Sequence, residues 1–486
     1  MKLPSVAVCR GHSAPLDFLR AQFVDRPPIV ACLGARGSGK SFGSALSCHL
    51  DSLVYPGIGS RILGGSLAQS AQIHEALGKF DEARPGRTPW KRYNRESVVY
   101  RNGSKVAILA CSAKSVRGPH VADLRLDEVD EIDSALRDAA MGMSMGLKGV
   151  PAMTVLTSTW HKLGGPMSDI VERGRAGEFP LFTMCIWEVL ETCPDERSGA
   201  NLERCDECPL KRWCHEDRDE RPDGLPKAKR SAGHYPIDSL IQKVRMVSAR
   251  VFGADYLCTG PKADGVWFKG FEVGRHVRPD AEYDPALPVY VSIDSGVFTG
   301  AVLFQHRPAV GSSPPRINVF GEYLSEGVTA YDAAQRILAE VLERCGPDAR
   351  RFVSTDSAGG ARNPVGPTVI AEYKRAGLVG VRNIEEWPKY AGCVADGLAT
   401  IEALIETADG TVHLAVHPRC VRTIAALQSY ARAKRAGQWQ DYPEDPQHPH
   451  EDLVDALRGG LKICLPNGLR SATAGFKTVS PRRVFK

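Results

Sequence analysis

The sequence has no long hydrophobic run, no strong excess of charge of one sign, no internal repeat and no low-complexity tract. A membrane-spanning helix needs about eighteen consecutive apolar residues, and no stretch approaches that length. The apolar run before Arg10 is too short for a signal peptide, so we expect an unsecreted protein without a membrane partner. The 62 basic residues outnumber the 57 acidic ones by 5, which permits nucleic-acid binding without requiring it.

The composition is that of a globular protein. A chain of 486 residues is long enough for two domains of unequal size with ample cores. Hydrophobic residues make up 43% of the chain and charged residues 24%, which excludes global disorder. Short apolar runs alternate with helical or loop stretches between residues 28 and 159, which predicts a mostly parallel sheet with helices on both faces. The expected strands are 29–33, 61–63, 106–110, 124–126 and 153–156.

The second half of the chain has a different order of elements. Three successive apolar runs joined by short turns predict an antiparallel meander, and helices and a further strand follow it. The expected strands are 288–294, 300–306, 316–323 and 351–355, and the expected helices are 237–251, 329–345, 368–376 and 452–463. We therefore divide the chain into an α/β domain (1–192), a cysteine-rich module (193–236), a helix with linker (237–270), a second α/β domain (271–468) and a basic flexible tail (469–486).

A glycine-rich loop follows the first expected strand directly. Residues 34–41 fit the phosphate-loop pattern G-x-x-x-x-G-K-[ST], and a helix-compatible stretch comes after them. Glycines let successive backbone N–H groups face nucleotide phosphates, the lysine reaches the outer phosphates, and the last hydroxyl can ligate Mg²⁺. The nucleotide-binding candidates are Gly34, Arg36, Gly37, Ser38, Gly39, Lys40 and Ser41.

Two acids end a later strand and supply the carboxylates that a phosphate loop itself lacks. Asp127 would hold Mg²⁺, and Glu128 would orient and deprotonate the attacking water. A solvated acidic turn is the alternative reading of this segment. The hydroxyl triplet 157–159 ends the next strand, where it could sense the outer phosphate. Arg36 and Arg117 are candidates for neutralising charge in the transition state, and ordinary surface arginines are the alternative.

Acidic residues also occupy strand ends and one helix face in the second half. Asp294 and Asp356 each end a strand, and Asp452 and Asp455 are three residues apart on one predicted helix face. Carboxylates cannot crowd together without a cation, so their convergence predicts bound Mg²⁺ or Mn²⁺. Two such ions suit in-line cleavage of a phosphodiester. Taken singly, each acid is better explained by a turn or a helix cap.

The chain has 14 cysteines, of which ten are scattered singly, as thiols are in a reducing compartment. The other four lie within 22 residues and are Cys193, Cys205, Cys208 and Cys214, with the spacing C-x11-C-x2-C-x5-C. A C-x2-C pair completed by two outlying thiols is a good structural zinc arrangement. The same thiolates could hold an iron–sulfur cluster, and buried free thiols are the third reading.

A phosphate-loop ATPase followed by a three-carboxylate nuclease resembles the large terminase subunit of tailed bacteriophages. The resemblance rests on Arg36 within the loop, the Leu126-Asp127-Glu128 segment, Asp294 and Asp356 at strand ends, and the closing segment 455–458. It implies an N-terminal P-loop ATPase domain that translocates double-stranded DNA and a C-terminal nuclease domain of RNase H-like fold that cuts concatemers. It implies Lys40, Ser41, Asp127 and Glu128 as ATPase residues and Asp294, Asp356 and Asp455 as metal ligands, with Asp452 as a possible fourth. The cysteine module departs from the common core of this family.

The resemblance also implies partners. We expect ATP and Mg²⁺ or Mn²⁺ as cofactors, and double-stranded DNA, a portal protein and a small terminase subunit as partners. A homo-oligomeric ring, a pentamer, would dock transiently at the procapsid portal vertex in the host cytoplasm without staying in the virion. Two other functions remain open: an ATP-dependent DNA repair or recombination nuclease, and an ATP-gated scaffold whose C-terminal acids are only structural.

Overall fold

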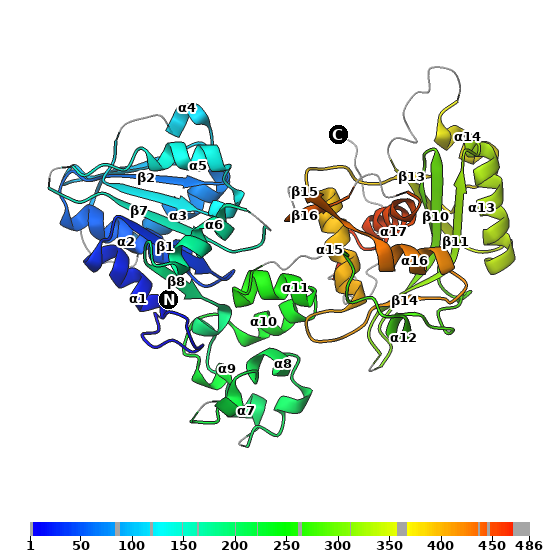
Figure 1. The fold of residues 1–486 in the computed structure, drawn as a ribbon, viewed down its shortest axis with the longest axis horizontal. Coiled ribbons are helices and arrows are strands. Elements are labelled where there is room, and N and C mark those ends of the chain that lie inside the picture. The colour runs from blue at the N-terminus through cyan, green and yellow to red at the C-terminus, as the bar shows by residue number, and fades with distance from the viewer. Residues whose placement is uncertain are drawn as a thin grey trace. The chain divides into compact units, whose positions relative to one another are not determined.

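The computed structural model describes residues 3–82, 88–116, 120–147, 149–162, 165–199, 201–220, 222–260, 265–311, 313–356, 367–435, 438–444 and 448–469. The chain forms two compact units (Figure 1), one comprising Met1–Gln242 with Arg250–Lys262 and the other Lys243–Ala249 with Ala263–Lys486. The segment expected to be a helix and linker, 237–270, is thus shared between the units. Within the described residues, no helix combines the length and the apolar character needed to cross a membrane.

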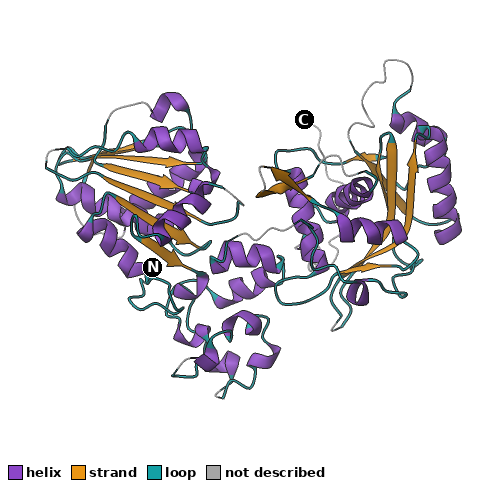
Figure 2. Cartoon of the chain, in the orientation of Figure 1, coloured by secondary structure: helices purple, strands orange, loops and turns teal. Residues whose placement is uncertain are grey.

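The first unit is built on an eight-stranded sheet with the order β3-β4-β5-β2-β6-β7-β1-β8. Its strands are β1 (Ile29–Gly34), β2 (Gly59–Gly64), β3 (Trp90–Tyr93), β4 (Ser97–Tyr100), β5 (Lys105–Ile108), β6 (Asp123–Asp127), β7 (Met153–Ser158) and β8 (Leu181–Met184). All neighbours from β5 to β8 are parallel, whereas β3 and β4 are antiparallel additions at one edge. The mostly parallel sheet predicted from the sequence is confirmed, with helices on both sides of it (Figure 2).

Helices and short turns connect these strands. They are α1 (Pro15–Arg20), η1 (Ala21–Asp25), α2 (Lys40–Val54), α3 (Leu67–Glu82), α4 (Ala113–Val116), η2 (Val129–Glu131), α5 (Ser134–Met141), α6 (Pro166–Arg175) and η3 (Ile186–Glu188). Strands β6 and β7 are buried along their whole length, as strands of a covered parallel sheet are. Because β6, β7 and β1 are paired in parallel, their carboxyl ends meet at one edge of the sheet.

A buried ionic network fixes strand β6 against helix α2. The Arg125 guanidinium donates hydrogen bonds to Asp123 at 2.9 Å, to Asp51 at 3.3 Å and to the Ser44 carbonyl at 2.7 Å. Burial alone would lower the pKa of Arg125, but the two carboxylates raise it, so the guanidinium stays charged. Removing one partner of such a network leaves an uncompensated buried charge. The network therefore holds the strand that ends in Asp127 in register with the helix that begins at Lys40.

The cysteine-rich segment of this unit consists of short helices and turns. They are α7 (Asp195–Ser198), η4 (Cys205–Glu207), α8 (Lys211–Cys214), η5 (Arg218–Glu220) and α9 (Lys227–Arg230), followed by α10 (Ile237–Val244), α11 (Ala249–Phe252) and η6 (Gly253–Leu257). The single helix expected over 237–251 is wrong, because two shorter helices replace it. Leu190 and Tyr235 form a parallel bridge that closes the base of the segment.

The second unit contains a six-stranded sheet with the order β13-β12-β9-β10-β11-β14. Its strands are β9 (Val289–Asp294), β10 (Phe298–Arg307), β11 (Arg316–Glu326), β12 (Arg351–Thr355), β13 (Glu385–Glu386) and β14 (Leu414–Val416), and a separate hairpin pairs β15 (Arg432–Arg435) with β16 (Gln438–Pro443). Strands β9 to β11 form the predicted antiparallel meander, and β12 pairs parallel with β9. A meander extended by parallel strands is the predicted RNase H-like arrangement.

Alternating side chains of this sheet belong to two separate cores. Val302 and Phe304 of β10 pack with one set of helices, whereas Ala301 and Leu303 pack with another set on the opposite face. The helices are α12 (Val273–His276), α13 (Ala330–Cys345), α14 (Val369–Arg375), α15 (Cys393–Ile405), α16 (Val421–Ser429) and α17 (His450–Cys464). Leu469 is buried in one of these cores, and residues 470–486 of the expected basic tail lie outside the described residues.

Candidate functional sites

The glycine-rich loop connects β1 to α2 and needs its glycines. Gly37 and Gly39 have φ angles of 79° and 81°, in the left-handed region that favours glycine. A Cβ on Gly34 would lie 2.8 Å from Ser38 Oγ, so a side chain there would collide with the loop. The sequence folds into a tight turn whose end is the first residue of α2, Lys40.

The loop lysine and serine contact the two acids at the end of β6. Lys40 Nζ lies 3.0 Å from Glu128 Oε1, and the Ser41 hydroxyl donates a hydrogen bond of 2.7 Å to Asp127. The Thr157 hydroxyl donates a second hydrogen bond, of 2.6 Å, to the other oxygen of Asp127. The structure thus brings together Lys40, Ser41, Asp127 and Glu128, and adds Thr157 from the end of β7.

Burial and charge set the protonation of this group. Burial, reinforced by Glu128, raises the pKa of Asp127 above its ordinary value, although Lys40 and the hydrogen-bonding hydroxyls act in the opposite direction. Burial would lower the pKa of Lys40, but Glu128 and Asp127 raise it, so the ammonium group stays charged. A charged lysine at the end of a glycine-rich loop, beside two acids, can bind an anion whose phosphates displace Glu128 from it.

The other acids near β6 hold the loop that follows β7. Asp130 accepts hydrogen bonds from the backbone N–H groups of His161, Lys162 and Met167 at 2.8–3.2 Å. Glu131 pairs with His161 and Lys162. These two acids therefore support the loop rather than extend the group around Asp127.

The two candidate arginines are not placed in that group. The Arg36 side chain is 61% exposed and its Nε lies 2.9 Å from Asp255 Oδ2. Arg117 lies outside the described residues. Tyr235 was not foreseen, yet its ring lies so close to Gly37 that a Cβ there would be 2.4 Å from Tyr235 Cε2. A tyrosine 198 positions from the loop carries no local pattern that marks this contact.

The carboxylates of the second unit come from two neighbouring strands and one helix. Thr355 pairs with Ile293 in the β9–β12 register, so Asp356 and Asp294 leave the sheet at the same edge. Asp294 pairs with Gly300 across β9 and β10. A Cβ on Gly300 would lie 2.7 Å from the Asp452 carbonyl, which places the first turn of α17 directly over this strand end.

The acids influence one another electrostatically. Burial raises the pKa of Asp294 to about 8, and the neighbouring charges of Asp455, Asp356 and Asp452 add to the effect. Arg458 opposes it and holds Asp455 through two contacts of 2.8 and 2.9 Å. The neighbouring carboxylates suppress the ionisation of Asp294. The site therefore lacks the positive charge that would stabilise all of its carboxylates in the ionised form.

Two residues beside these acids were not predicted from the sequence to belong to the site. His448 Nδ1 lies 2.9 Å from Asp452 Oδ2, and its ring stacks on Phe298 with 4.6 Å between centroids. Asp452 raises the pKa of His448. Arg458 closes the segment 455–458, and its i, i+3 spacing from Asp455 favours the observed ion pair.

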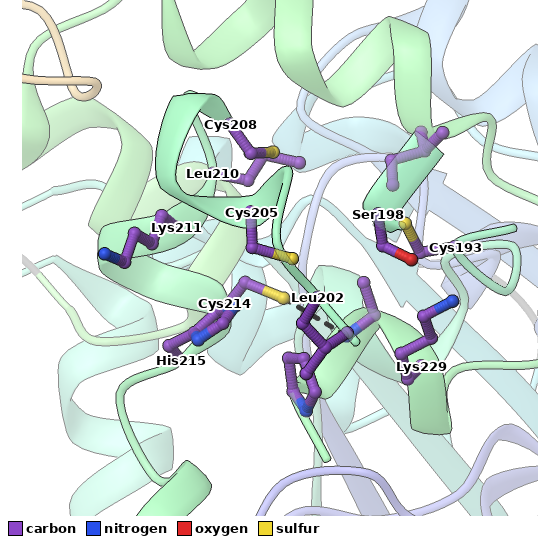
Figure 3. Close-up of a pocket in the computed structure, with 13 residues that line it drawn as sticks. Cys193, Ser198, Leu202, Cys205, Cys208, Leu210, Lys211, Cys214, His215 and Lys229 are labelled. Atoms are coloured by element: carbon purple, nitrogen blue, oxygen red, sulfur yellow. Dashed lines mark hydrogen bonds between the residues drawn. The ribbon is translucent and has the colours of Figure 1, made fainter. Parts of the chain in front are cut away.

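The four clustered cysteines line one pocket (Figure 3). Cys193, Cys205, Cys208 and Cys214 share this pocket with His215 and several apolar side chains. Burial raises the pKa of Cys193, Cys205 and Cys214, the last to about 12. The backbone N–H of Ala228 donates a hydrogen bond of 3.4 Å to Cys214 Sγ.

Comparison with known proteins adds evidence for the fold. No family model and no curated protein matches the chain. Among solved structures, the large terminase from a thermophilic bacteriophage in complex with ATP-γ-S has a TM-score of 0.53 at 14% identity, covering 92% of this chain and 97% of that chain. Another crystal form of the same thermophilic phage's large terminase has a TM-score of 0.52 at 13% identity, covering 93% and 98%. The chain therefore has the fold of a bacteriophage large terminase over more than nine-tenths of its length.

Proposed function

We propose that this protein is the large terminase subunit of a tailed bacteriophage, an ATP-driven motor that packages double-stranded DNA and a nuclease that cuts concatemers. The observation that carries the proposal is the pairing of two clusters in one chain of this fold. One unit joins Lys40, Ser41, Asp127 and Glu128 through direct contacts. In the other unit, Asp455, Asp356 and Asp452 all act on the ionisation of Asp294.

In the ATPase unit, each residue has a distinct task. The glycines at 37 and 39 turn backbone N–H groups toward the phosphates, and Lys40 neutralises the outer phosphates once they displace Glu128. Glu128, freed from Lys40, orients and deprotonates the water that attacks the terminal phosphate. A Mg²⁺ ion held by Ser41 and Asp127 would supply positive charge to the phosphates. The hydrogen bond from Thr157 keeps Asp127 oriented toward Ser41.

In the nuclease unit, the carboxylates fit divalent cations. The raised pKa of Asp294 is the physical reason, because a cation would offset the burial and the repulsion by neighbouring carboxylates that keep this group protonated. Asp294, Asp356 and Asp455 would hold Mg²⁺ or Mn²⁺, with Asp452 as a further ligand. Such ions supply a nucleophilic hydroxide and stabilise the leaving oxygen in phosphodiester hydrolysis. Arg458 fixes the orientation of Asp455, and His448 that of Asp452.

The cysteine module is proposed to hold a structural zinc ion. Four thiols that line one pocket, three of them with pKa values raised by burial, are chemically suited to a soft cation that stabilises their thiolates. The hydrogen bond from the Ala228 backbone N–H to Cys214 Sγ is the kind of contact that orients a thiolate ligand. An iron–sulfur cluster is the alternative occupant. The test is metal analysis of freshly purified protein. Finding neither zinc nor iron in stoichiometric amount would rule out both the zinc ion and the iron–sulfur cluster.

The proposed role also requires partners. A ring of five copies would dock on the portal of the procapsid in the host cytoplasm, and a small terminase subunit would deliver the DNA. The hairpin β15–β16 offers a surface suited to nucleic acid, since Lys434 lies 4.9 Å from the Trp439 ring and Arg435 5.5 Å from the Tyr442 ring. Binding to purified portal rings would distinguish this role from a repair nuclease.

The experiment that tests the proposal uses the full-length chain and two substitutions. Lys40→Ala should abolish ATP hydrolysis and leave Mn²⁺-dependent nicking of plasmid DNA intact. Asp294→Ala should do the reverse, with nicking reduced by at least about 100-fold. Equal nicking by wild type and Asp294→Ala would defeat the nuclease assignment, and would favour a scaffold whose acids are only structural.

A further inference from the structure

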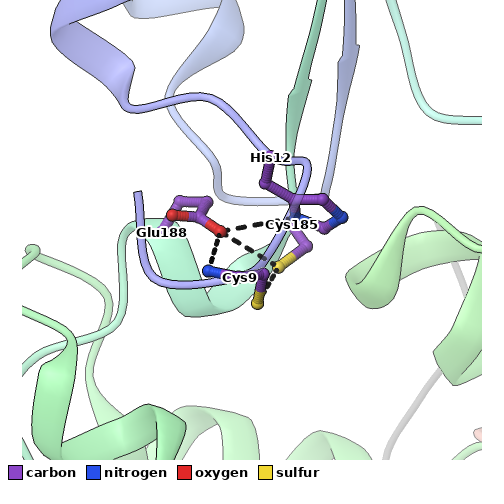
Figure 4. Close-up of side chains that lie close together, drawn as sticks. All are labelled: Cys9, His12, Cys185 and Glu188. Atoms are coloured by element: carbon purple, nitrogen blue, oxygen red, sulfur yellow. Dashed lines mark hydrogen bonds and ion pairs between the residues drawn. The ribbon is translucent and has the colours of Figure 1, made fainter. Parts of the chain in front are cut away.

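A second group of metal-binding side chains lies in the first unit, away from the phosphate loop and outside the cysteine module. Cys9 and His12 come from the segment before α1, and Cys185 and Glu188 come from the turn after β8 (Figure 4). One potential ligand atom from each residue lies within 4.8 Å of all the others. The sequence pattern does not predict this group, because its two halves are more than 170 residues apart.

The distances within the group match those of a tetrahedral site. Zinc binds sulfur at about 2.3 Å and nitrogen or oxygen at about 2.0–2.2 Å, so tetrahedral ligand atoms lie about 3.4–3.8 Å from one another. Here Cys9 Sγ is 3.6 Å from Cys185 Sγ, and Cys185 Sγ is 3.9 Å from Glu188 Oε1. His12 Nδ1 is 3.3 Å from the same Glu188 oxygen. Each of these three separations is within about 0.3 Å of a tetrahedral edge.

The surroundings of the group are already arranged as those of a ligand set. Glu188 is fully buried, and its carboxylate accepts hydrogen bonds from the backbone N–H groups of Val8 at 2.6 Å and Cys9 at 3.0 Å. His12 Nδ1 is itself buried and lies 3.3 Å from Glu188 Oε1. An imidazole nitrogen, a carboxylate and two thiols gathered at one point are a donor set that a single zinc ion would bind.

We propose that Cys9, His12, Cys185 and Glu188 bind a zinc ion that fastens the N-terminal segment to the sheet beside the phosphate loop. Two thiolates and an imidazole select zinc over the hard cations Mg²⁺ and Ca²⁺. This site is separate from the proposed zinc of the cysteine module, and it does not depend on the proposed function.

The position of the group gives the ion a structural task. Cys185 directly follows Met184, which pairs with Gly34 in the β1–β8 register and accepts a hydrogen bond of 2.9 Å from the Ala35 backbone N–H. On the other edge of β8, the Ser13 backbone N–H donates a hydrogen bond of 2.8 Å to the Thr183 carbonyl. The ion would therefore fix the N-terminal segment to the strand that flanks the start of the phosphate loop.

The test compares metal content in the full-length protein and its variants. Elemental analysis should show that Cys185→Ser and His12→Ala each lose one zinc equivalent relative to wild type, whereas Cys111→Ser, at an exposed cysteine outside both groups, loses none. X-ray absorption at the zinc edge of a Cys205→Ser/Cys208→Ser variant should show a remaining ion with two sulfur and two nitrogen or oxygen neighbours. Unchanged zinc in both Cys185→Ser and His12→Ala would overturn the proposal.

A second readout follows the segment itself. Arg10 lies between two of the ligands and is exposed, so trypsin should cut after it slowly in wild type and at least about tenfold faster in His12→Ala, because the freed segment opens more often. Cutting after the exposed Arg95, in the loop between β3 and β4, should not change. A Cys9–Cys185 disulfide found in unreduced peptides, together with metal content that is the same in every variant, would replace the zinc ion and contradict the proposal.

Discussion

At the scale of single residues, Glu128 joins the end of β6 to the lysine of the phosphate loop. This residue has a φ angle of 52°, unusual for a residue other than glycine, and its carboxylate is paired with Lys40. Strained backbone that surrounding contacts maintain often marks a functional position. The ion pair holds the Glu128 carboxylate on Lys40, and nucleotide phosphates that bind Lys40 would release it.

The first prediction concerns Glu128→Gln, which keeps the size of the side chain and removes its capacity as a base. We expect kcat for ATP hydrolysis to fall by about 10²–10⁴-fold while ATP still binds, because a general base contributes about this factor. Turnover assays and the fluorescence of a labelled nucleotide measure the two quantities. Glu131→Gln is the matched control, since Glu131 pairs with His161 and Lys162 and should be dispensable for turnover. Equal kcat in both variants would remove Glu128 from the mechanism.

The second prediction uses the raised pKa of Asp294, about 8. Between the unfolded value near 3.8 and the folded value the native state binds more protons than the unfolded state, so metal-free protein loses stability as pH rises through this window. Asp294→Asn removes that loss. In EDTA, the Tm of the variant should exceed that of wild type by a margin that grows from about pH 4 to about pH 8 and is constant above it.

The control for this prediction is Asp348→Asn, at an exposed acid of the same unit, which should follow wild type at both pH values. Added Mn²⁺ should raise the Tm of wild type more than that of Asp294→Asn. If the Tm difference between wild type and Asp294→Asn were independent of pH, Asp294 would titrate normally and the acids would not form a coupled group.

The residue types and spacings made part of the sites predictable. Residues 34–41 follow a strand and match a motif with a known backbone geometry, so the sequence is sufficient to identify the loop. Tyr235 and Arg125 were harder, because each acts through a tertiary contact or a buried network that has no local pattern. The triplet 157–159 marked Thr157 as a candidate, but not its hydrogen bond to Asp127. The Cys9 group combines two short segments that only the pairing of β8 with β1 brings near the loop.

At the scale of elements, helix α17 presses against the sheet of the second unit through glycines. A Cβ on Gly460 would lie 2.6 Å from Ser292 Cβ, and a Cβ on Gly300 would meet the Asp452 backbone. Both contacts are too short for any side chain. The closeness of α17 to β9 and β10 is what brings Asp452 and Asp455 to the edge where Asp294 and Asp356 end.

The third prediction tests this packing with Gly300→Ala. The added methyl group should push the first turn of α17 away from β10, lower stability by about 1–3 kcal/mol and weaken Mn²⁺-dependent nicking by at least about tenfold. Thermal unfolding and plasmid nicking measure the two effects. Gly274→Ala, where a Cβ would have no atom within 4 Å, is the control and should change neither. Normal nicking by Gly300→Ala would show that α17 does not need this close approach.

The fourth prediction concerns the contact between the phosphate loop and the segment that closes the cysteine module. Gly37→Ala would place a methyl group against the Tyr235 ring, and should raise the KM for ATP by at least about tenfold. Gly177→Ala is the matched control, because Gly177 has a similar φ angle of 84° and open space at its Cβ position. If both variants bound ATP alike, the contact with the tyrosine would be irrelevant to nucleotide binding.

Several elements could not be predicted. The edge strands β3 and β4 and the hairpin β15–β16 are short. Strands β3 (WKRY) and β15 (RAKR) are rich in basic residues, and β4 (SVVY) has only four residues, so none of them shows the apolar periodicity that identified β1, β6 and β7. The expected helix over 237–251 divides at residues 245–248, because Ser248 instead forms an antiparallel bridge with Thr407. Long apolar strands and the helices α13 and α17 followed their sequence periodicity closely.

At the scale of the whole molecule, one chain carries two sheets of different topology, each with acids at a strand end. The fold matches a bacteriophage large terminase at only 13–14% identity, so the likeness lies in the order and pairing of the elements rather than in the residues. Two cysteine-containing groups in the first unit have no counterpart in the terminase motifs identified from the sequence. They would make this protein dependent on zinc as well as on the cations of its two proposed reactions.

The most direct test of the account is a crystal structure of the full-length protein grown with a non-hydrolysable ATP analogue and Mn²⁺. Anomalous scattering should place manganese beside Ser41 and Asp127 in the first unit and among Asp294, Asp356 and Asp455 in the second. Carboxylates of the second unit that point apart with no manganese between them would contradict the nuclease assignment and with it the proposal of a packaging motor that cuts its own DNA.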